Sequence, residues 1–316
     1  MSDPAELMPL AIAPTPLRLR REENGWQAAS RHFFRLAASG LISPRWFTRP
    51  PPPEPLRRQA TGRLTIEVVS HCWQYAHLLV YQLSSLVLHP PRNVDVRMTV
   101  FYAAEDEATA KLLAYFSEHK VPGVRWNWQI LPREQLMRRS IGRNIAALAT
   151  RANWVWFTDC DLIFGEGCLD RLAQRLQGRT DALVYPQEEQ CTALLPDSDT
   201  CLQYNAAKPR IVAANGLSKP KSVTRATGPL QITHGDVARA TGYCNAIKAC
   251  QMPASHWCKA HEDRIFRWLL GTQGVPLDIP GVQRIRHVTK GRYNGSHSNT
   301  QWRKWVRRSK DAAIGR

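Results

Sequence analysis

The sequence lacks several features that would define its class at once. It has no run of about 18 consecutive apolar residues, so no transmembrane helix is expected. No two of its eight cysteines have the C-x-x-C spacing of a zinc or redox motif. Prolines interrupt the weakly apolar N-terminus, and the positive charge follows that stretch, which is the wrong order for a secretory signal. We therefore expect a cytoplasmic protein.

Acidic residues are few relative to basic ones. The 316 residues include 43 Lys and Arg against 26 Asp and Glu, which gives a net charge of +17 and a pI near 10.0. Such a surface attracts nucleic acid, acidic lipid headgroups or phosphorylated substrates. With 43% apolar residues the chain is not wholly disordered. Several cysteines lie in apolar stretches, so we expect reduced thiols; oxidised pairing among Cys191, Cys201, Cys244, Cys250 and Cys258 stays an alternative.

The sequence predicts three parts. Residues 1–60 form an N-terminal tail, an amphipathic helix over 26–42 and a proline-rich linker at 50–55; residues 61–290 form the main domain; residues 291–316 form a basic tail. The helix has two interpretations, because its aromatic and arginine residues suit either packing on the main domain or peripheral contact with an anionic membrane at its inner face.

From residue 64 onward, strand-like and helix-like segments alternate. We expect strands at 64–69, 94–102, 124–131 and 153–158, and helices at 75–88, 105–119 and from a capping Ser140 to residue 149. Four such repeats within about 100 residues predict right-handed βαβ units. The expected fold class is α/β, with a mostly parallel central sheet flanked by helices.

The fourth predicted strand ends in two carboxylates. The buried-type stretch 153–158 runs directly into Asp159, Cys160 and Asp161. Side chains alternate along a strand, so both aspartates project on one side at the carboxyl edge, where such sheets bind ligands. Glu105 and Asp106 follow the second strand at this edge. A divalent cation would relieve the repulsion and carry nucleotide phosphates, although a merely acidic loop is the simpler alternative.

The last third of the chain adds two candidates. Glu262 and Asp263 begin a predicted helix, where acids commonly cap but can also accept a proton from a hydroxyl nucleophile. His287 ends a short predicted strand, as a packed residue or a metal ligand. Residues 187–221 are expected to form a long irregular segment on the acceptor side or over the site.

Taken in order, these motifs resemble those of the GT-A glycosyltransferases, particularly family 2 enzymes and the β-1,4-galactosyltransferase-like group. The resemblance spans residues 64–290 and rests on short motifs. They are Arg143-Asn144, Phe157-Thr158-Asp159-Cys160-Asp161, Gly228-Pro229-Leu230-Gln231 with Gly242-Tyr243, Glu262-Asp263-x-Ile265-Phe266 and Arg284-Ile285-Arg286-His287.

The resemblance implies a Rossmann-like GT-A fold and a metal-dependent, inverting transfer of a sugar from a nucleotide-sugar donor to a hydroxyl acceptor. Asp159, Asp161 and His287 would bind Mn²⁺ or Mg²⁺, with His297 as the alternative to His287. Asp263 would be the catalytic base. The donor-binding residues implied are Glu105, Asp106, Arg143, Asp159, Gly228 and Glu262.

The sequence also departs from the family. Its first strand ends in Ser70-His71-Cys72 rather than Pro-Thr-Tyr-Asn, and the approach from Trp257 to Glu262 differs, so no acceptor is inferred. A nucleic-acid-binding protein is one alternative, since residues 284–316 hold ten Lys and Arg against one Asp. No recognised nucleic-acid motif accompanies them, and an acidic crevice disfavours a polyanion. A metal-dependent phosphoesterase could use the same carboxylates.

Overall fold

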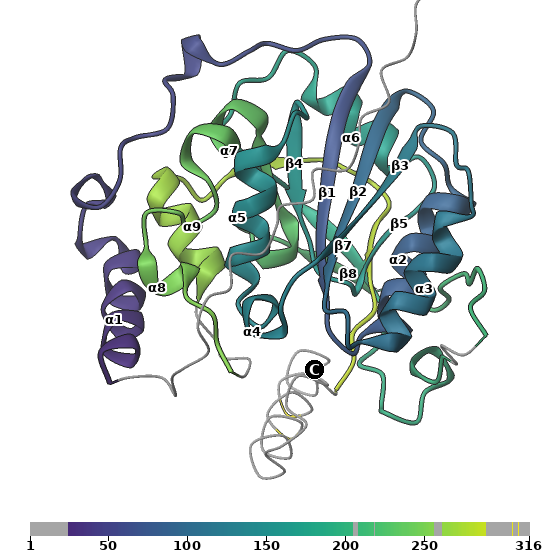
Figure 1. Ribbon diagram of the computed structural model, residues 1–316. Coiled ribbons are helices and arrows are strands. Elements are labelled where there is room, and N and C mark those ends of the chain that lie inside the picture. The colour runs from purple at the N-terminus through teal and green to yellow at the C-terminus, as the bar shows by residue number, and fades with distance from the viewer. Residues whose placement is uncertain are drawn as a thin grey trace, which may run out of the picture.

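A seven-stranded sheet forms the centre of the molecule (Figure 1). The computed structural model describes residues 25–204, 208–217, 219–255, 261–288, 305 and 309, without the side chains of residues 26–28 and 31. The strand order is β10-β6-β9-β4-β1-β2-β3, and every strand is parallel to the others except β9. The strands are β1 (Leu64–Cys72), β2 (Val94–Tyr102), β3 (Val124–Ile130), β4 (Trp154–Phe157), β6 (Leu183–Pro186), β9 (Gln231–His234) and β10 (Val275–Leu277).

Helices cover both faces of this sheet, and each face has its own apolar core. On one face lie α2 (Ala76–Leu88), α3 (Glu107–Ser117) and α6 (Cys168–Leu176). On the other lie α5 (Arg139–Ala149), α7 (Gly235–Thr241) and α9 (Glu262–Leu270). β4 shows why both cores form, because Trp154 and Trp156 enter the first core whereas Val155 and Phe157 enter the second. The predicted fold class is confirmed.

A second sheet of four short strands lies beyond the carboxyl edge, in the order β5-β11-β7-β8. These strands are β5 (Leu162–Phe164), β7 (Glu188–Cys191), β8 (Lys219–Ser222) and β11 (Val282–Arg284). The expectation that residues 187–221 are wholly irregular is therefore wrong. β7 and β8 pair there as antiparallel strands, and the short helix η4 (Thr200–Leu202) lies between them.

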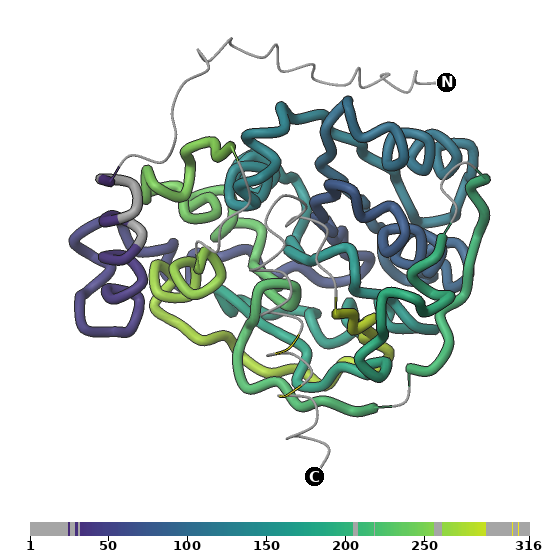
Figure 2. Tube along the Cα trace, turned by 90° about the horizontal axis from the view of Figure 1, so that it is seen from below, coloured from purple at the N-terminus to yellow at the C-terminus, as the bar shows by residue number. Residues whose placement is uncertain are grey.

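The N-terminal segment packs against α9. It comprises α1 (Gly25–Leu36), the π-helical turn η1 (Ala37–Leu41) and the short helix η2 (Pro44–Trp46), whereas the next short helix, η3 (Glu54–Leu56), contacts Thr180 instead. Phe34 and Phe47 contact the ring of Trp268, whose Nε1 donates to the carbonyl of Ile42 at 2.8 Å. Figure 2 shows this purple segment beside the yellow-green α9. Packing on the main domain, one of the two predicted arrangements, is thus observed.

Three short helices, α4 (Arg133–Leu136), η5 (Gly228–Leu230) and α8 (Lys248–Gln251), complete the elements of the described residues. Within the described residues, no helix is long and apolar enough to cross a membrane. The seven cysteines in this part of the chain are free thiols, and Cys258 lies outside the described residues. The predicted basic tail at 291–316 also lies outside them, apart from residues 305 and 309.

Candidate active site

Asp159 and Asp161 lie at the carboxyl edge of the main sheet, just after β4. All four residues of β4 are buried, and the N–H of Thr158 extends the pairing by donating to the carbonyl of Val69 at 2.9 Å. The chain then leaves the sheet, and the two aspartates are half-buried. They occupy the edge at which open α/β sheets bind ligands.

Two arginines of α5 hold Asp159. Arg139 and Arg143 lie one helical turn apart. Nη1 of Arg139 is 2.5 Å from Oδ1 of Asp159, and Nη2 of Arg143 is 3.4 Å from the same oxygen. Burial lowers the pKa of Arg139, but the carboxylates of Asp159 and Glu262 together outweigh it, so that the pKa lies above its usual value. The guanidinium therefore stays charged. The sequence motifs pointed to Arg143 but not to Arg139.

Arg139 also connects this edge to the second acidic pair. Its Nε lies 3.9 Å from Oε2 of Glu262, the first residue of α9. Glu262 is buried and accepts a hydrogen bond from Oγ of Ser140 at 3.0 Å. The prediction that Ser140 caps α5 is wrong, because Arg138 is the N-cap residue and makes no side-chain cap. The hydroxyl of Ser140 instead reaches Glu262 and the carbonyl of Cys250.

A chain of hydrogen bonds leads from Arg143 to Asp263. Nη1 of Arg143 donates to Oη of Tyr243 at 2.9 Å, and this hydroxyl donates to Oε1 of Gln231 at 2.8 Å. Nε2 of Gln231 donates to the carbonyl of Asp263 at 3.1 Å. Burial raises the pKa of Tyr243, so its phenol stays protonated and can donate. The chain fixes α5, β9 and the start of α9 relative to one another.

Glu262 and Asp263 differ in their access to solvent. The side chain of Glu262 is 8% exposed, whereas that of Asp263 is 36% exposed. Nη1 of Arg267 lies 3.5 Å from Oδ2 of Asp263, and a Cβ added at Gly228 would lie 3.7 Å from the Cβ of Asp263. Gly228 therefore lies against Asp263. Of the two acids, Asp263 is the one that a molecule entering from solvent can reach.

Glu189 is a carboxylate that the sequence motifs did not reveal. Its side chain is fully buried in β7, with Lys221 Nζ and Arg284 Nη2 each 2.6 Å from one of its oxygens. Burial lowers the pKa of Arg284, but Asp161, Glu189 and Asp159 raise it by more. Arg284 thus joins the buried Glu189 electrostatically to both aspartates of the strand end. If β7 had been predicted, the alternation of exposed and buried side chains along a strand would have identified Glu189 as a buried residue.

Glu105 and Asp106 follow β2, as the sequence placed them, but only Asp106 is buried. Oδ1 of Asp106 accepts the N–H of Thr109 at the start of α3, and Oδ2 accepts the N–H of Gln74 at 2.6 Å. Asp106 therefore caps a helix and holds the turn after β1. A nucleotide contact by Glu105 or Asp106 stays a prediction.

The unusual end of β1 is explained by the path of α5. The ring of His71 stacks on Phe101, with centroids 5.1 Å apart. α5 crosses this pair at Gly142, where an added Cβ would overlap Nε2 of His71. The thiol of Cys160 donates to the carbonyl of His71 at 2.8 Å, which ties the end of β1 to the acidic pair.

His287 is not brought into a metal cluster. It is buried beside Tyr75, with ring centroids 5.9 Å apart, and forms a bridge with Leu195. Among the described residues, no group of three or more His, Cys, Asp and Glu side chains is arranged to hold a metal ion. His297 lies outside that part of the chain. Asp161 still fits a cation bound in another way, because Mg²⁺ is commonly held by one or two carboxylates together with substrate phosphates and water.

No model of a known protein family matches the sequence. A comparison with curated proteins finds no match either. Among solved structures, S. aureus TarS 1–349 in complex with UDP-GlcNAc is 12% identical with a TM-score of 0.45, over 74% of this chain and 62% of that one. Another structure of S. aureus TarS 1–349 is 11% identical with a TM-score of 0.41, over 71% of this chain and 58% of that one.

A mannosyltransferase, PcManGT from Pyrobaculum calidifontis, was solved in complex with GDP-Man and Mn²⁺. It is 15% identical with a TM-score of 0.43, over 86% of this chain and 68% of that one. The chain thus spans less than two thirds of the TarS chains. All three TM-scores are below 0.5, so the fold described above rests on the strand order and not on these similarities.

Proposed function

We propose that this chain is a glycosyltransferase. It transfers a sugar from a nucleoside diphosphate sugar to the hydroxyl group of an acceptor, with inversion at the anomeric carbon and with the aid of a divalent cation. The catalytic domain in this proposal is residues 61–290. The observation that carries it is the position of Arg139 between Asp159 and Glu262, two acids more than 100 residues apart in sequence at one edge of the sheet.

The two acidic pairs suit different halves of such a reaction. Asp159 and Asp161 stand beside Arg139, Arg143 and Arg284, and this mixture of fixed positive charge and carboxylate oxygens suits a diphosphate with its cation. Asp263 is the more exposed acid of the other pair, which suits contact with an acceptor. In this proposal Asp159 and Asp161 serve the nucleotide-sugar donor, and Asp263 serves the acceptor.

In the proposed reaction, Asp263 accepts the proton of the acceptor hydroxyl. The oxygen forms a bond to the anomeric carbon of the donor sugar, and the bond from that carbon to the diphosphate oxygen breaks. The nucleoside diphosphate leaves with the bonding electron pair. A divalent cation held by Asp161 would stabilise the negative charge that develops on this leaving group. Arg139 and Arg143 hold the carboxylate of Asp159 in place throughout.

The proposal is tested by nucleotide binding, because the donor site can be titrated without an acceptor. Isothermal titration of the full chain with UDP and GDP, each with and without Mn²⁺, should show binding that the cation strengthens. Asp161→Asn should abolish the effect of Mn²⁺ and leave the weaker, metal-free binding. Asp278→Asn is the matched control, because Asp278 is exposed and lies 3.3 Å from Arg175 on the surface.

Three outcomes would contradict the proposal. Absence of nucleotide binding under all conditions would exclude a nucleotide-sugar site. Release of inorganic phosphate from phosphate esters, lost in Asp161→Asn, would assign the carboxylates to a phosphoesterase. Binding to oligonucleotides that falls steeply with salt, with no response to Mn²⁺ and nucleotide, would favour a nucleic-acid-binding protein.

A further inference from the structure

The N-terminal segment exposes four large apolar side chains. Leu41 is 84% exposed, Trp46 is 79% exposed, Leu36 is 57% exposed and Phe33 is 43% exposed. We call these four residues the N-terminal apolar face. Phe33 and Leu36 lie three residues apart on α1, so they share one side of the helix. Exposed Leu and Trp in one short segment, rather than scattered singly, indicate an interaction surface.

This face is held on a rigid support. Behind it, Phe34 and Phe47 pack on Trp268, and Nε of Arg264 donates to the carbonyl of Ala38 at 3.0 Å. Gly40 has a φ of +100°, which turns the chain between Ala38 and the exposed Leu41. The inner side of the segment is therefore already occupied by α9.

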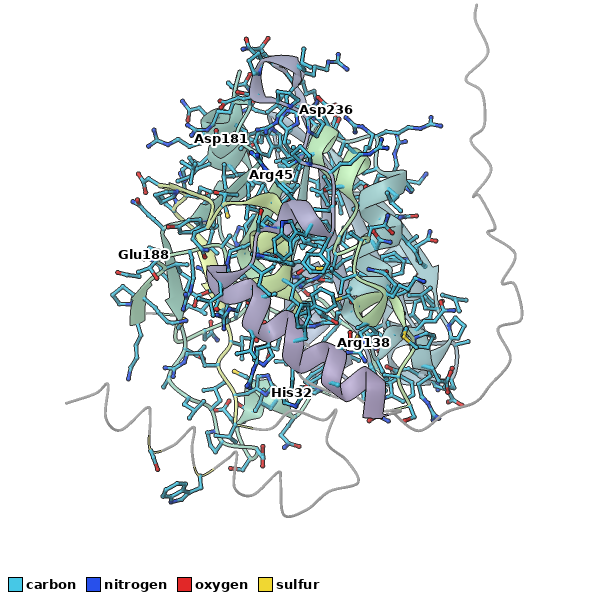
Figure 3. The ribbon with its side chains drawn as sticks, turned by 90° about the vertical axis from the view of Figure 1, so that its left-hand side faces the viewer. His32, Arg45, Arg138, Asp181, Glu188 and Asp236 are labelled. Carbon is cyan, nitrogen blue, oxygen red and sulfur yellow. The ribbon has the colours of Figure 1, made fainter. Side chains whose placement is uncertain are left out.

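The same segment carries charge of one sign only. Residues 25–53 contain four arginines and no aspartate or glutamate. Arg35, Arg45 and Arg49 are exposed. Figure 3 looks onto this side of the molecule, with α1 across the front and His32 and Arg45 labelled. Exposed apolar side chains bordered by arginines are the composition of segments that lie at a membrane interface.

We propose that the N-terminal apolar face docks the protein on an anionic lipid bilayer. Leu41 and Trp46 enter the boundary between headgroups and acyl chains, and the neighbouring arginines contact lipid phosphates. Charge favours this partner over a second copy of the chain, because a two-fold contact would bring arginines of the same segment together without acids to offset them. It also differs from nucleic-acid binding, which would not use Leu36 and Leu41. The proposal is independent of the glycosyltransferase activity.

Flotation of the full chain with lipid vesicles tests it. Vesicles of phosphatidylglycerol and phosphatidylcholine in equal parts should carry the protein, and vesicles of phosphatidylcholine alone should carry much less. Leu41→Ser with Trp46→Ser should weaken partition into anionic vesicles by roughly 30-fold or more, since each such side chain loses most of its apolar burial. Arg45→Gln with Arg49→Gln should weaken it by roughly 10-fold or more, and added salt should have the same effect on the unmodified chain.

A matched pair of substitutions controls for exposed apolar residues in general. Leu88 is 44% exposed and Ile130 is 61% exposed, and both lie outside the segment. Leu88→Ser with Ile130→Ser should leave partition unchanged. The proposal is overturned if the full chain does not float with anionic vesicles, or if Leu41→Ser with Trp46→Ser floats as well as the unmodified chain. Sedimentation showing a dimer that this double variant dissociates, without vesicle binding, would assign the face to a second copy instead.

Discussion

Nη1 of Arg139 lies 2.5 Å from Oδ1 of Asp159, and this ion pair joins the first residue of α5 to the loop after β4. Both side chains are about one fifth exposed, 21% and 22%, so the pair is neither on the open surface nor fully desolvated. Charge-assisted hydrogen bonds of this kind are stronger than neutral ones. The same guanidinium also lies near Glu262, so the loss of Arg139 removes one positively charged partner from each of two carboxylates.

Arg139→Gln should therefore destabilise the protein. We expect the free energy of unfolding to fall by about 1–3 kcal/mol, because a partly buried carboxylate loses a charged hydrogen bond. Urea denaturation followed by circular dichroism measures this change. Arg175→Gln is the control, because Arg175 pairs with Asp278 where both are more than half exposed, and should change the value by about 0.5 kcal/mol or less. Equal effects of the two substitutions would show that Arg139 has no special role.

Asp263→Asn should separate chemistry from donor binding. If Asp263 is the base, the variant loses at least about 100-fold in the rate of sugar transfer, since general base catalysis contributes 10²–10⁴-fold. Its affinity for nucleoside diphosphate with Mn²⁺ should be unchanged in titration calorimetry. Glu262→Gln is the informative comparison, because Glu262 is buried against Ser140 and Arg139 and should affect stability first. A transfer rate retained in Asp263→Asn would exclude the assignment.

Glu189→Gln should be strongly destabilising. The substitution keeps the shape of the side chain but leaves Lys221 and Arg284 without their shared carboxylate. Removal of one partner from a buried charge pair costs about 3 kcal/mol or more. Thermal and urea unfolding should show this loss, whereas Glu188→Gln on the exposed side of the same strand should change the free energy by about 0.5 kcal/mol or less. Similar values for the neighbours would contradict the burial argument.

His234 predicts a dependence of stability on pH. Its Nδ1 accepts the N–H of Asp236 at 3.2 Å and its Nε2 lies 3.2 Å from the carbonyl of Arg58, which together require a neutral imidazole. Burial lowers the pKa of His234 below its ordinary value, and burial also lowers that of His77. The unfolded chain then binds the proton more readily than the folded one. Stability should therefore be full above about pH 6.5 and decline as the pH falls below it toward the folded-state pKa.

Urea unfolding at several pH values between 8 and 5 tests this expectation. His234→Asn keeps an oxygen that can accept the N–H of Asp236 but removes the titrating group. The decline of stability toward acidic pH should become shallower in this variant, and His77 should account for a part that remains. His32→Asn, at an exposed position of α1, serves as the comparison. Identical pH profiles for His234→Asn and the unmodified chain would contradict the assignment.

The first half of the fold could be predicted because its signals are local. The strand at 94–102 is observed as predicted, and α2 begins one residue after its expected start. Both were predictable because the apolar periodicity of an element and the prolines that end it lie within a few residues of one another in the sequence. The insertion of β9 between β4 and β6 could not be predicted, since a strand of four residues carries no sign of its partner. The pairing of β7 with β8 was missed for the same reason, across a long connection.

The site could be predicted only in part. Asp159, Asp161, Arg143 and Asp263 lie in recognisable motifs at the ends of predicted elements. The sequence alone does not distinguish Arg138, Arg139 and Arg143, however. Which of these arginines reach Asp159 depends on how α5 is rotated about its axis relative to β4, and in the structure Arg139 and Arg143 do. The cap that Asp106 provides for α3 follows a local pattern, because Asp is a preferred N-cap residue, whereas its second contact, with the N–H of Gln74, is indicated by no local pattern.

The insertion of β9 also constrains how the chain folds as it is synthesised. Phe157 of β4 pairs with Gln231 of β9, which is added to the chain 74 residues later. At a synthesis rate of about 5–20 residues per second, the ribosome adds β9 about 4–15 s after β4, so one edge of β4 stays unpaired for that time. During that interval the N–H and C=O groups along this edge of β4 are unpaired and can bond to other strands, and two of the four residues of β4 are tryptophans. Slowing translation between these strands should therefore increase aggregation of the nascent chain more than slowing it after residue 234.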